Sequence, residues 1–225
     1  MNPTYNILII DDHQIIVDGY KNAIMYYLSN RINYKLIIDS ANECSTAIKK
    51  ISQTDHKEKY DLILLDISLP YCDEYKINSG EELGLLIKDL VPDIKIIVIT
   101  SHMDNFRINN ILRNLNPDGF LLKKDISAKE LAFSIELVIS GTPSYSKSVA
   151  TLIRKKISHK LFLDDLDIKI LIEITNGTKT KDFVKYIPLS KAGIEKRKRL
   201  LKEAFKISTG SDRELVLSAR MKGFI

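Results

Sequence analysis

The sequence predicts an α/β protein: a doubly wound domain with a five-stranded parallel sheet, followed by a small all-α domain of four helices. Short runs rich in Ile, Leu and Val alternate with helical patterns over residues 1–140. Strand signals cease after a Gly/Pro/Ser segment near residue 141. The charge changes there too. Residues 1–140 carry 15 Lys and Arg against 20 Asp and Glu, whereas residues 141–225 carry 19 against 9. This asymmetry indicates two domains and a polyanion as the binding partner of the second.

Five short runs predict the strands of the sheet. Each is almost continuously apolar, which is typical of parallel strands that are covered on both faces. The runs are residues 6–10, 34–39, 61–66, 94–100 and 119–122. Helical patterns fill the intervals between them, so we expect helices on both faces of the sheet.

A Ser followed three residues later by Glu marks several expected helix starts. In this capping box, the two side chains satisfy free backbone N–H groups of the first helical turn. The pattern begins at Ser40, Ser79, Ser127 and Ser211. Each of these serines therefore predicts a helix on its C-terminal side.

Polar residues end or follow four of the predicted strands. In doubly wound sheets the carboxyl ends of the strands form the ligand-binding edge. The residues there are Asp11, Asp12, Asp66, Thr100 and Lys123. Carboxylate oxygens suit Mg²⁺, and an aspartate beside such a metal can form an acyl phosphate. Any one of them alone is more simply a turn or helix cap, but their joint placement predicts a phosphoryl-transfer site.

Residues 163–225 carry helical signals only. An apolar stripe over 164–175 ends at Asn176-Gly177, and a short helix is expected from about Thr180. Pro188 breaks that helix, and Ser190 begins a basic helix that runs to about Phe205. Two helices joined by a tight turn, the second rich in Lys and Arg, form the helix-turn-helix pattern.

The basic helix has two distinct sides. At about 100° per residue, Ile194, Leu201 and Phe205 face the core. Lys196 and Arg199 lie on the other side with Glu195 and are expected to enter a major groove. Phosphate contacts are expected from the flanks and from the start of the preceding helix, namely from Arg197, Lys198, Lys202, Lys179 and Lys181. Taken alone, such a charge run is usually a solvated helix face.

The first 140 residues resemble the receiver domain of two-component response regulators, which has a flavodoxin-like fold. The resemblance rests on Ile9-Ile-Asp-Asp-His13, Leu64-Leu-Asp-Ile-Ser-Leu-Pro70, Ile99-Thr-Ser101 and Gly119-Phe-Leu-Leu-Lys123. It implies that Asp66 is the phosphoacceptor and that Mg²⁺ is held by Asp11, Asp12, Asp66 and the backbone carbonyl of Ser68. It also implies catalytic support from Lys123 and a switch pair of Thr100 and Phe120. Phe120 stands where the family often has Tyr, and by itself would be a core residue.

The sequence departs from the receiver pattern after Pro70. The family usually reaches the next Gly within a few residues, whereas here residues 71–79 precede Gly80. This longer segment is either a surface insertion, tolerated at small entropic cost, or a contact with the partner kinase or a gate over the site.

Residues 167–225 resemble the LuxR-type helix-turn-helix of NarL/FixJ regulators. The matching stretches are Thr178-Lys-Thr-Lys-Asp-Phe183 and Ser190-Lys-Ala-Gly-Ile194. By this resemblance Ser190, Lys191 and Glu195 also belong to the DNA-contacting start of the recognition helix. Gly193 replaces the usual Thr and Arg197 the usual His, so the preferred DNA sequence does not follow from the family.

These observations predict a DNA-binding response regulator with a receiver domain (1–140), a partly helical linker (141–162) and a helix-turn-helix domain (163–225). A sensor histidine kinase would phosphorylate Asp66, and a homodimer would bind palindromic double-stranded DNA. The alternative is a phosphorylation-independent transcription regulator whose receiver serves for dimerisation. A phosphatase is disfavoured because Ser68 stands where a second carboxylate would act as acid or base, so no enzyme is expected beyond slow self-phosphorylation and autodephosphorylation.

Location and redox state follow from what the sequence lacks. No apolar run reaches about 18 residues, and the N-terminus has no signal-peptide pattern, so we expect a cytoplasmic protein without a membrane partner. Cys44 and Cys72 have neither metal-ligand nor redox spacing and are expected to be reduced, packed thiols.

Overall fold

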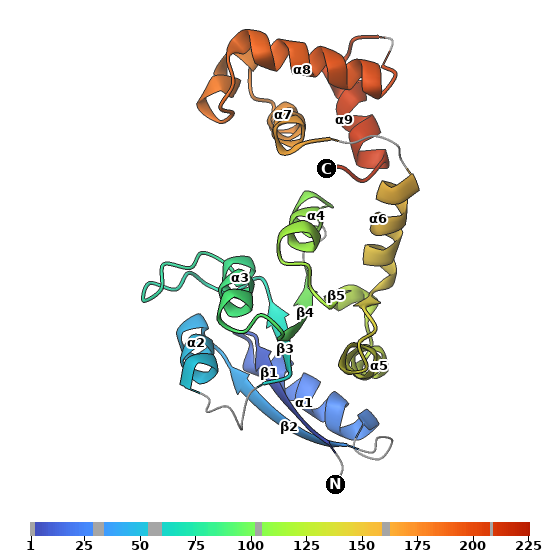
Figure 1. The fold of residues 1–225 in the computed structure, drawn as a ribbon. Coiled ribbons are helices and arrows are strands. Elements are labelled where there is room, and N and C mark those ends of the chain that lie inside the picture. The colour runs from blue at the N-terminus through green and yellow to red at the C-terminus, as the bar shows by residue number, and fades with distance from the viewer. Residues whose placement is uncertain (1–2, 29–33, 54–59, 102–104, 159–162, 208) are drawn as a thin grey trace. The chain divides into compact units, whose positions relative to one another are not determined.

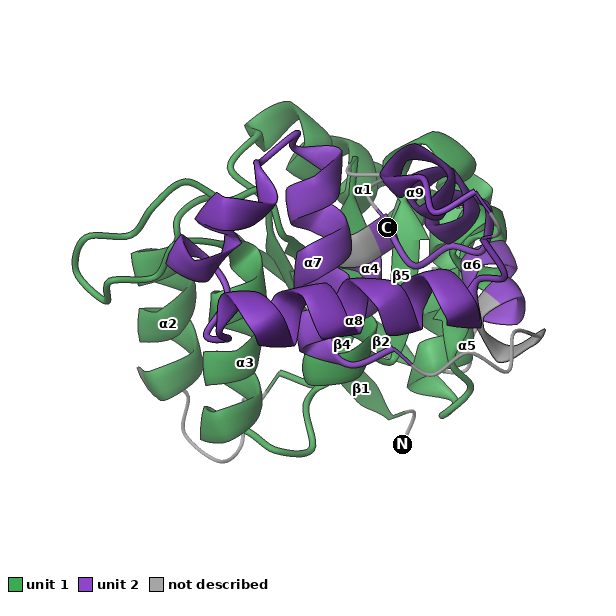
Figure 2. Ribbon diagram, turned by 90° about the horizontal axis from the view of Figure 1, so that it is seen from above, with its two compact units in different colours: residues 1–103, 110–150 green, residues 104–109, 151–225 purple. Residues whose placement is uncertain are grey.

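The computed structural model describes residues 3–28, 34–53, 60–101, 105–158, 163–207 and 209–225. The chain divides into two compact units, residues 1–103 with 110–150 and residues 104–109 with 151–225 (Figure 2). The division at residue 150 falls inside the segment 141–162 that the sequence predicts as a linker. The domain limits at residues 140 and 163 stay a prediction.

The first unit contains a parallel sheet with the strand order β2-β1-β3-β4-β5-β6 (Figure 1). The strands are β1 (Thr4–Ile10), β2 (Lys35–Ala41), β3 (Leu62–Asp66), β4 (Lys95–Thr100), β5 (Gly119–Leu122) and β6 (Ser144–Tyr145). The predicted fold class is confirmed, but the sheet has six strands rather than five. The sixth strand has only two residues and follows Gly141-Thr-Pro143, so it carries no readable periodicity.

Helices cover both faces of this sheet. They are α1 (Gln14–Leu28), α2 (Cys44–Gln53), α3 (Gly80–Leu90), α4 (Asn105–Asn114) and α5 (Ala128–Ile139), with a short 3₁₀ helix η1 (Lys123–Asp125) after β5. Alternate strand residues such as Ile7, Ile9 and Leu64 pack against α1 and α5 in one buried cluster, while α2 and α3 lie on the other face (Figure 1). Each such buried aliphatic side chain contributes about 1.5–3 kcal/mol.

Three of the four predicted capping serines begin a helix. Ser79, Ser127 and Ser211 each accept a hydrogen bond from the backbone N–H of the glutamate three residues later. The prediction for Ser40 was wrong. Ser40 lies inside β2, and α2 begins only at Cys44. Pairing of β2 with β1, which extends to Ala41, outweighs the local capping signal.

The second unit contains helices only within the part of the chain that the structure describes. These are α6 (Lys147–Ser158), which starts in the first unit, α7 (Asp165–Thr175), η2 (Thr180–Lys185), α8 (Lys191–Ala204) and α9 (Asp212–Met221). The expected short helix from Thr180 is a 3₁₀ helix of six residues. Over the described residues, no helix is both long enough and apolar enough to cross a lipid bilayer.

The extra residues after Pro70 form a small hairpin that is attached to α2. Cys72 and Ile77 exchange backbone hydrogen bonds with N···O distances of 2.8 and 3.2 Å. Lys49 Nζ lies 3.1 Å from Glu74 Oε2, and the Cys72 thiol is hydrogen-bonded to Cys44. Both thiols are free and buried, and burial raises the pKa of Cys44 to about 12, so this thiol stays protonated. Whether the hairpin contacts a kinase or gates the site stays a prediction.

Candidate functional site

The sheet positions a set of buried polar residues at the carboxyl ends of its strands. Asp11 follows β1 directly, Asp66 and Thr100 are the last residues of β3 and β4, and Lys123 follows β5. Asp11 is 1% exposed, Asp66 4% and Thr100 0%. Since an unpaired buried carboxylate is costly, this arrangement requires a nearby cation and hydrogen-bond donors.

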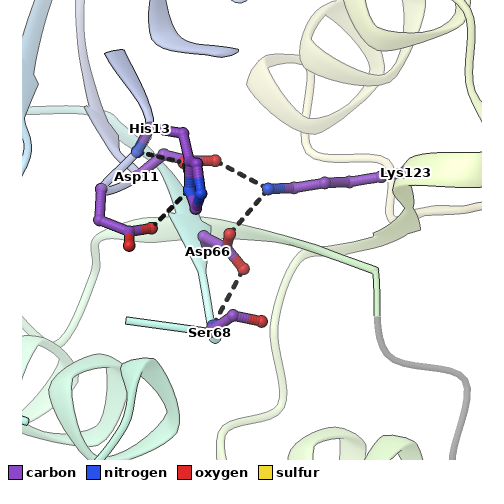
Figure 3. A network of polar contacts seen from close by, with 6 residues as sticks. Asp11, His13, Asp66, Ser68 and Lys123 are labelled. Carbon is purple, nitrogen blue, oxygen red and sulfur yellow. Dashed lines mark hydrogen bonds and ion pairs between the residues drawn. The ribbon is translucent and has the colours of Figure 1, made fainter. Parts of the chain in front are cut away.

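Lys123 supplies that cation (Figure 3). Its Nζ donates to Asp66 Oδ2 at 2.7 Å and to Asp11 Oδ2 at 2.9 Å. The remaining oxygens accept from backbone N–H groups, Asp66 Oδ1 from Ser68 and Asp11 Oδ1 from His13, each at 3.0 Å. Three of the residues singled out in the sequence are therefore in direct contact, although they are separated by up to 112 positions.

The charge state of Lys123 follows from two opposing effects. Burial lowers the pKa of Lys123, but hydrogen bonds and charge attraction with Asp66 and Asp11 outweigh it, and the net result is a raised pKa. Lys123 is thus a permanent ammonium at neutral pH. It can stabilise negative charge that develops on a group bound to Asp66.

The donor set beside Asp66 fits a magnesium ion. Asp11, Asp12 and His13 each offer one ligand atom within 4.8 Å of the others. The carboxylate oxygens are hard ligands of the kind that Mg²⁺ prefers. His13 Nδ1 lies 2.9 Å from Asp12 Oδ1. His13 has no site role predicted from the sequence, and its position next to Asp12 is the only signal that could have indicated one. The roles of the Ser68 carbonyl and of the metal itself stay predictions.

The two residues of the expected switch pair lie in the sheet. Phe120 is fully buried in β5, and Thr100 pairs in register with Leu122 of the same strand. The switching of Thr100 and Phe120 stays a prediction. Gly80, the first residue of α3, lies against the backbone of Asp66 and Ile67, and its N–H donates to the Ile67 carbonyl at 3.2 Å.

The basic helix α8 packs as its periodicity predicts. Ser190 caps it by accepting from Gly193 N at 3.2 Å. Ile194, Leu201 and Phe205 lie in the core of the second unit. Six of the residues expected to contact DNA are exposed, namely Glu195, Lys196, Arg199, Lys191, Lys179 and Lys181.

Three basic residues of α8 are instead held by carboxylates of other helices. Arg197 Nη1 lies 2.7 Å from both Asp164 Oδ2 and Asp167 Oδ1. The Lys198 side chain is only 8% exposed, and its Nζ lies 2.8 Å from Asp212 Oδ2, so its expected place on a solvated flank was wrong. Lys202 Nζ lies 2.6 Å from Asp212 Oδ1. DNA contacts by Arg197 and Lys202 stay predictions, and a phosphate would have to replace the carboxylates in these ion pairs.

The same ion pairs predict a pH dependence of stability. Burial acts to raise the pKa of Asp212, but Lys198 and Lys202 outweigh it and lower the pKa below its ordinary 3.8. A lowered folded-state pKa stabilises the fold above the unfolded-state pKa, and this contribution is lost as the pH falls through the folded-state pKa. We expect the thermal unfolding temperature to be steady down to about pH 5 and to decrease below about pH 4.

The variant Asp212→Asn is expected to unfold at a lower temperature at pH 7 and to show a shallower decrease in acid. Glu195→Gln removes an exposed carboxylate of α8 and serves as the control. An acid decrease in Asp212→Asn as steep as in the wild type would contradict the assignment.

Comparison with known proteins gives a family model and a set of similar folds. Residues 7–136 match the response regulator receiver domain. No curated protein matches the chain. A structure of two RcsB dimers bound to two parallel DNAs has 20% identity and a TM-score of 0.63, covering 96% of this chain and 98% of that one.

Two further solved structures have the same fold. RcsB from Salmonella enterica serovar Typhimurium, bound to a promoter in the presence of the phosphomimetic BeF3⁻, has 21% identity and a TM-score of 0.63, covering 95% of this chain and 97% of that one. A LuxR-family two-component response regulator from Aurantimonas sp. SI85-9A1 has 22% identity and a TM-score of 0.54, covering 68% and 98%. At these identities the likeness concerns the fold.

Proposed function

Because this chain belongs to the response regulator family, with its receiver domain at residues 7–136, we propose that phosphorylation of Asp66 switches DNA binding by residues 163–225. The observation that carries the proposal is the pairing of buried Asp66 with Lys123 at the carboxyl edge of the sheet. The natural donor would be a sensor histidine kinase, and the protein would act in the cytoplasm without turning over a substrate.

The phosphoryl transfer requires few chemical groups. A carboxylate oxygen of Asp66 bonds to phosphorus while the bond to the donor's leaving group breaks, and the leaving group keeps the electron pair. Lys123 stabilises the charge on the phosphoryl oxygens, and the Ser68 N–H orients the carboxylate. Mg²⁺ held by Asp11, Asp12, Asp66 and the Ser68 carbonyl would neutralise further phosphoryl charge. Thr100 would then hydrogen-bond the phosphoryl group, and the Phe120 ring would shift with it.

DNA binding is supported by exposed positive charge on a packed helix. Lys196 and Arg199 project from α8 opposite its buried residues, and the C-terminal 85 residues carry an excess of ten positive charges. RcsB, which has the same fold, occurs as dimers bound to DNA. We therefore infer a homodimer on a palindromic duplex, with half-sites about one helical turn or a multiple of it apart.

The chemical part of the proposal is tested by intact mass spectrometry after incubation with acetyl phosphate and Mg²⁺. We expect the wild type to gain one labile phosphoryl group, and Asp66→Asn to gain at least about 100-fold less, since its side chain is not a nucleophile. Asp89→Asn, which removes an exposed carboxylate of α3, is expected to react like the wild type. A wild-type protein that gains no phosphoryl group from any donor would instead support a phosphorylation-independent DNA-binding regulator.

A further inference from the structure

The segment that leaves the receiver is bonded to the strand that precedes Lys123. β6 pairs with β5 through Phe120↔Tyr145. Beyond it, Ser146 N donates to the Phe120 carbonyl at 3.0 Å, and the Ser146 hydroxyl accepts from Leu122 N at 3.2 Å. Ser146 is 7% exposed. The start of α6 is therefore fixed to the backbone on both sides of Leu121.

Asp125 completes this attachment. Its Oδ2 accepts from Ser148 N at 2.8 Å and from the Ser146 hydroxyl at 3.0 Å, and its Oδ1 accepts from the Ser148 hydroxyl at 3.0 Å. An N-cap side chain normally accepts from the second or third helical N–H group of its own helix. Here the residue before α6, Ser146, turns its hydroxyl toward β5 and Asp125, and a carboxylate from a distant position caps the helix instead.

Asp125 is also close in the chain to the phosphorylation site. η1 begins at Lys123 and ends at Asp125, and the Lys123 ammonium donates a hydrogen bond to the Asp66 carboxylate. A phosphoryl group on Asp66 adds negative charge and bulk where that ammonium now binds. Lys123 must therefore adjust to the new oxygens, and any backbone adjustment reaches Asp125 within two residues.

We propose that Asp125 is a positioning residue that transmits the phosphorylation state of Asp66, through Lys123 and η1, to the N-terminus of α6. This inference rests on the proposed function and adds to it the contact that carries the signal out of the receiver. The carboxylate suits the role because it accepts all three hydrogen bonds while ionised. Partial burial acts to raise the pKa of Asp125, but its bonds to Ser148 and Ser146 outweigh it and lower the pKa.

Hydrogen exchange of the backbone amides of residues 146–151 in the full chain measures this contact directly. Each protein is compared before and after reaction with acetyl phosphate, and intact mass gives the phosphoryl occupancy. In the wild type we expect phosphorylation to change the exchange of these amides by at least about threefold. In Asp125→Ala we expect exchange to be about tenfold faster before reaction and to change little upon phosphorylation.

Two matched variants separate this role from general destabilisation. Lys124→Ala removes the exposed neighbour within η1 and should behave like the wild type. Asp125→Asn keeps one carbonyl oxygen and the side-chain volume, so its response to phosphorylation should be intermediate. This variant tests the inference if Asp125→Ala fails to fold. Phosphoryl occupancy should match the wild type in all three, because the hydrogen bonds of Asp125 go to Ser146 and Ser148 and the Lys124 side chain is exposed.

The outcomes distinguish the two proposals. A wild type without a phosphoryl group overturns the proposed function, and this inference with it. A phosphorylated wild type whose residues 146–151 exchange unchanged overturns the inference alone. The same holds if the Asp125 variants respond to phosphorylation as the wild type does.

Discussion

Replacing Gly80 by Ala is expected to destabilise the receiver by about 3 kcal/mol or more and to displace Asp66. A Cβ atom at this position would collide with the Asp66 carbonyl oxygen and lie 2.6 Å from Ile67 Cα. Both atoms belong to the backbone, so no side-chain rotation relieves the collision. Either α3 moves away from β3, or the end of β3 moves and takes the Asp66 carboxylate away from Lys123.

A second glycine in the same domain provides the control. Gly19 lies in α1, and a Cβ atom there would meet nothing within 4 Å. Gly19→Ala should therefore be neutral or stabilise by up to about 1 kcal/mol through helix propensity. Urea unfolding followed by circular dichroism, with phosphoryl uptake in parallel, measures both variants. Equal stability of Gly80→Ala and Gly19→Ala would show that the start of α3 does not lie against the backbone of Asp66 as described.

Two lysines of α8 are expected to have opposite roles. Lys198→Met should destabilise the second unit by about 1–3 kcal/mol, because it removes the buried partner of Asp212 and Thr180. The loss of stability is modest for a buried ion pair because Asp212 keeps its ion pair with Lys202. Lys196→Met makes the same change in charge at an exposed position, so its stability should stay within about 0.5 kcal/mol of the wild type.

The two variants should differ in the opposite way in their DNA binding: Lys196→Met should change it and Lys198→Met should not. Lys196→Met should weaken binding to a duplex, and if it removes a phosphate contact it should lower the slope of log affinity against log salt by about one. Lys198→Met, measured at a temperature where it is folded, should keep the wild-type salt slope. A lower slope in Lys198→Met with no loss of stability would place its ammonium on the DNA and contradict the internal ion pair. Thermal unfolding and fluorescence anisotropy across salt concentrations provide the two measurements.

The receiver site was predictable because topology determines it. Parallel strands end at one edge of the sheet, which brings Asp11, Asp66 and Lys123 together. The errors came from local signals overruled by distant contacts. Ser40 has a capping pattern, but strand pairing with β1 keeps it extended. The sixth strand is too short to carry a pattern and forms only because β5 offers it an edge.

The helix-turn-helix surface was predictable in its exposed residues but not in its ion pairs. The helical angle alone places Lys198 about 40° from Ile194, on the buried side. The charge of lysine favours a flank position, whereas this geometry favours the core. Its partner Asp212 lies on α9, and the partners of Arg197 belong to the start of α7, so only the tertiary fold reveals them. The same is true of Asp125, whose capping of α6 spans 23 residues.

The central claim is that a phosphoryl group on Asp66 changes the affinity for DNA. The most direct test measures the affinity of one protein preparation, before and after reaction with acetyl phosphate, for the tightest duplex recovered from a random pool. Intact mass gives the phosphoryl occupancy of each sample, and Asp66→Asn is carried in parallel. We predict a change of at least about fivefold in the dissociation constant, present in the wild type and absent in Asp66→Asn. Equal affinity of the fully phosphorylated and unphosphorylated wild type would contradict the account.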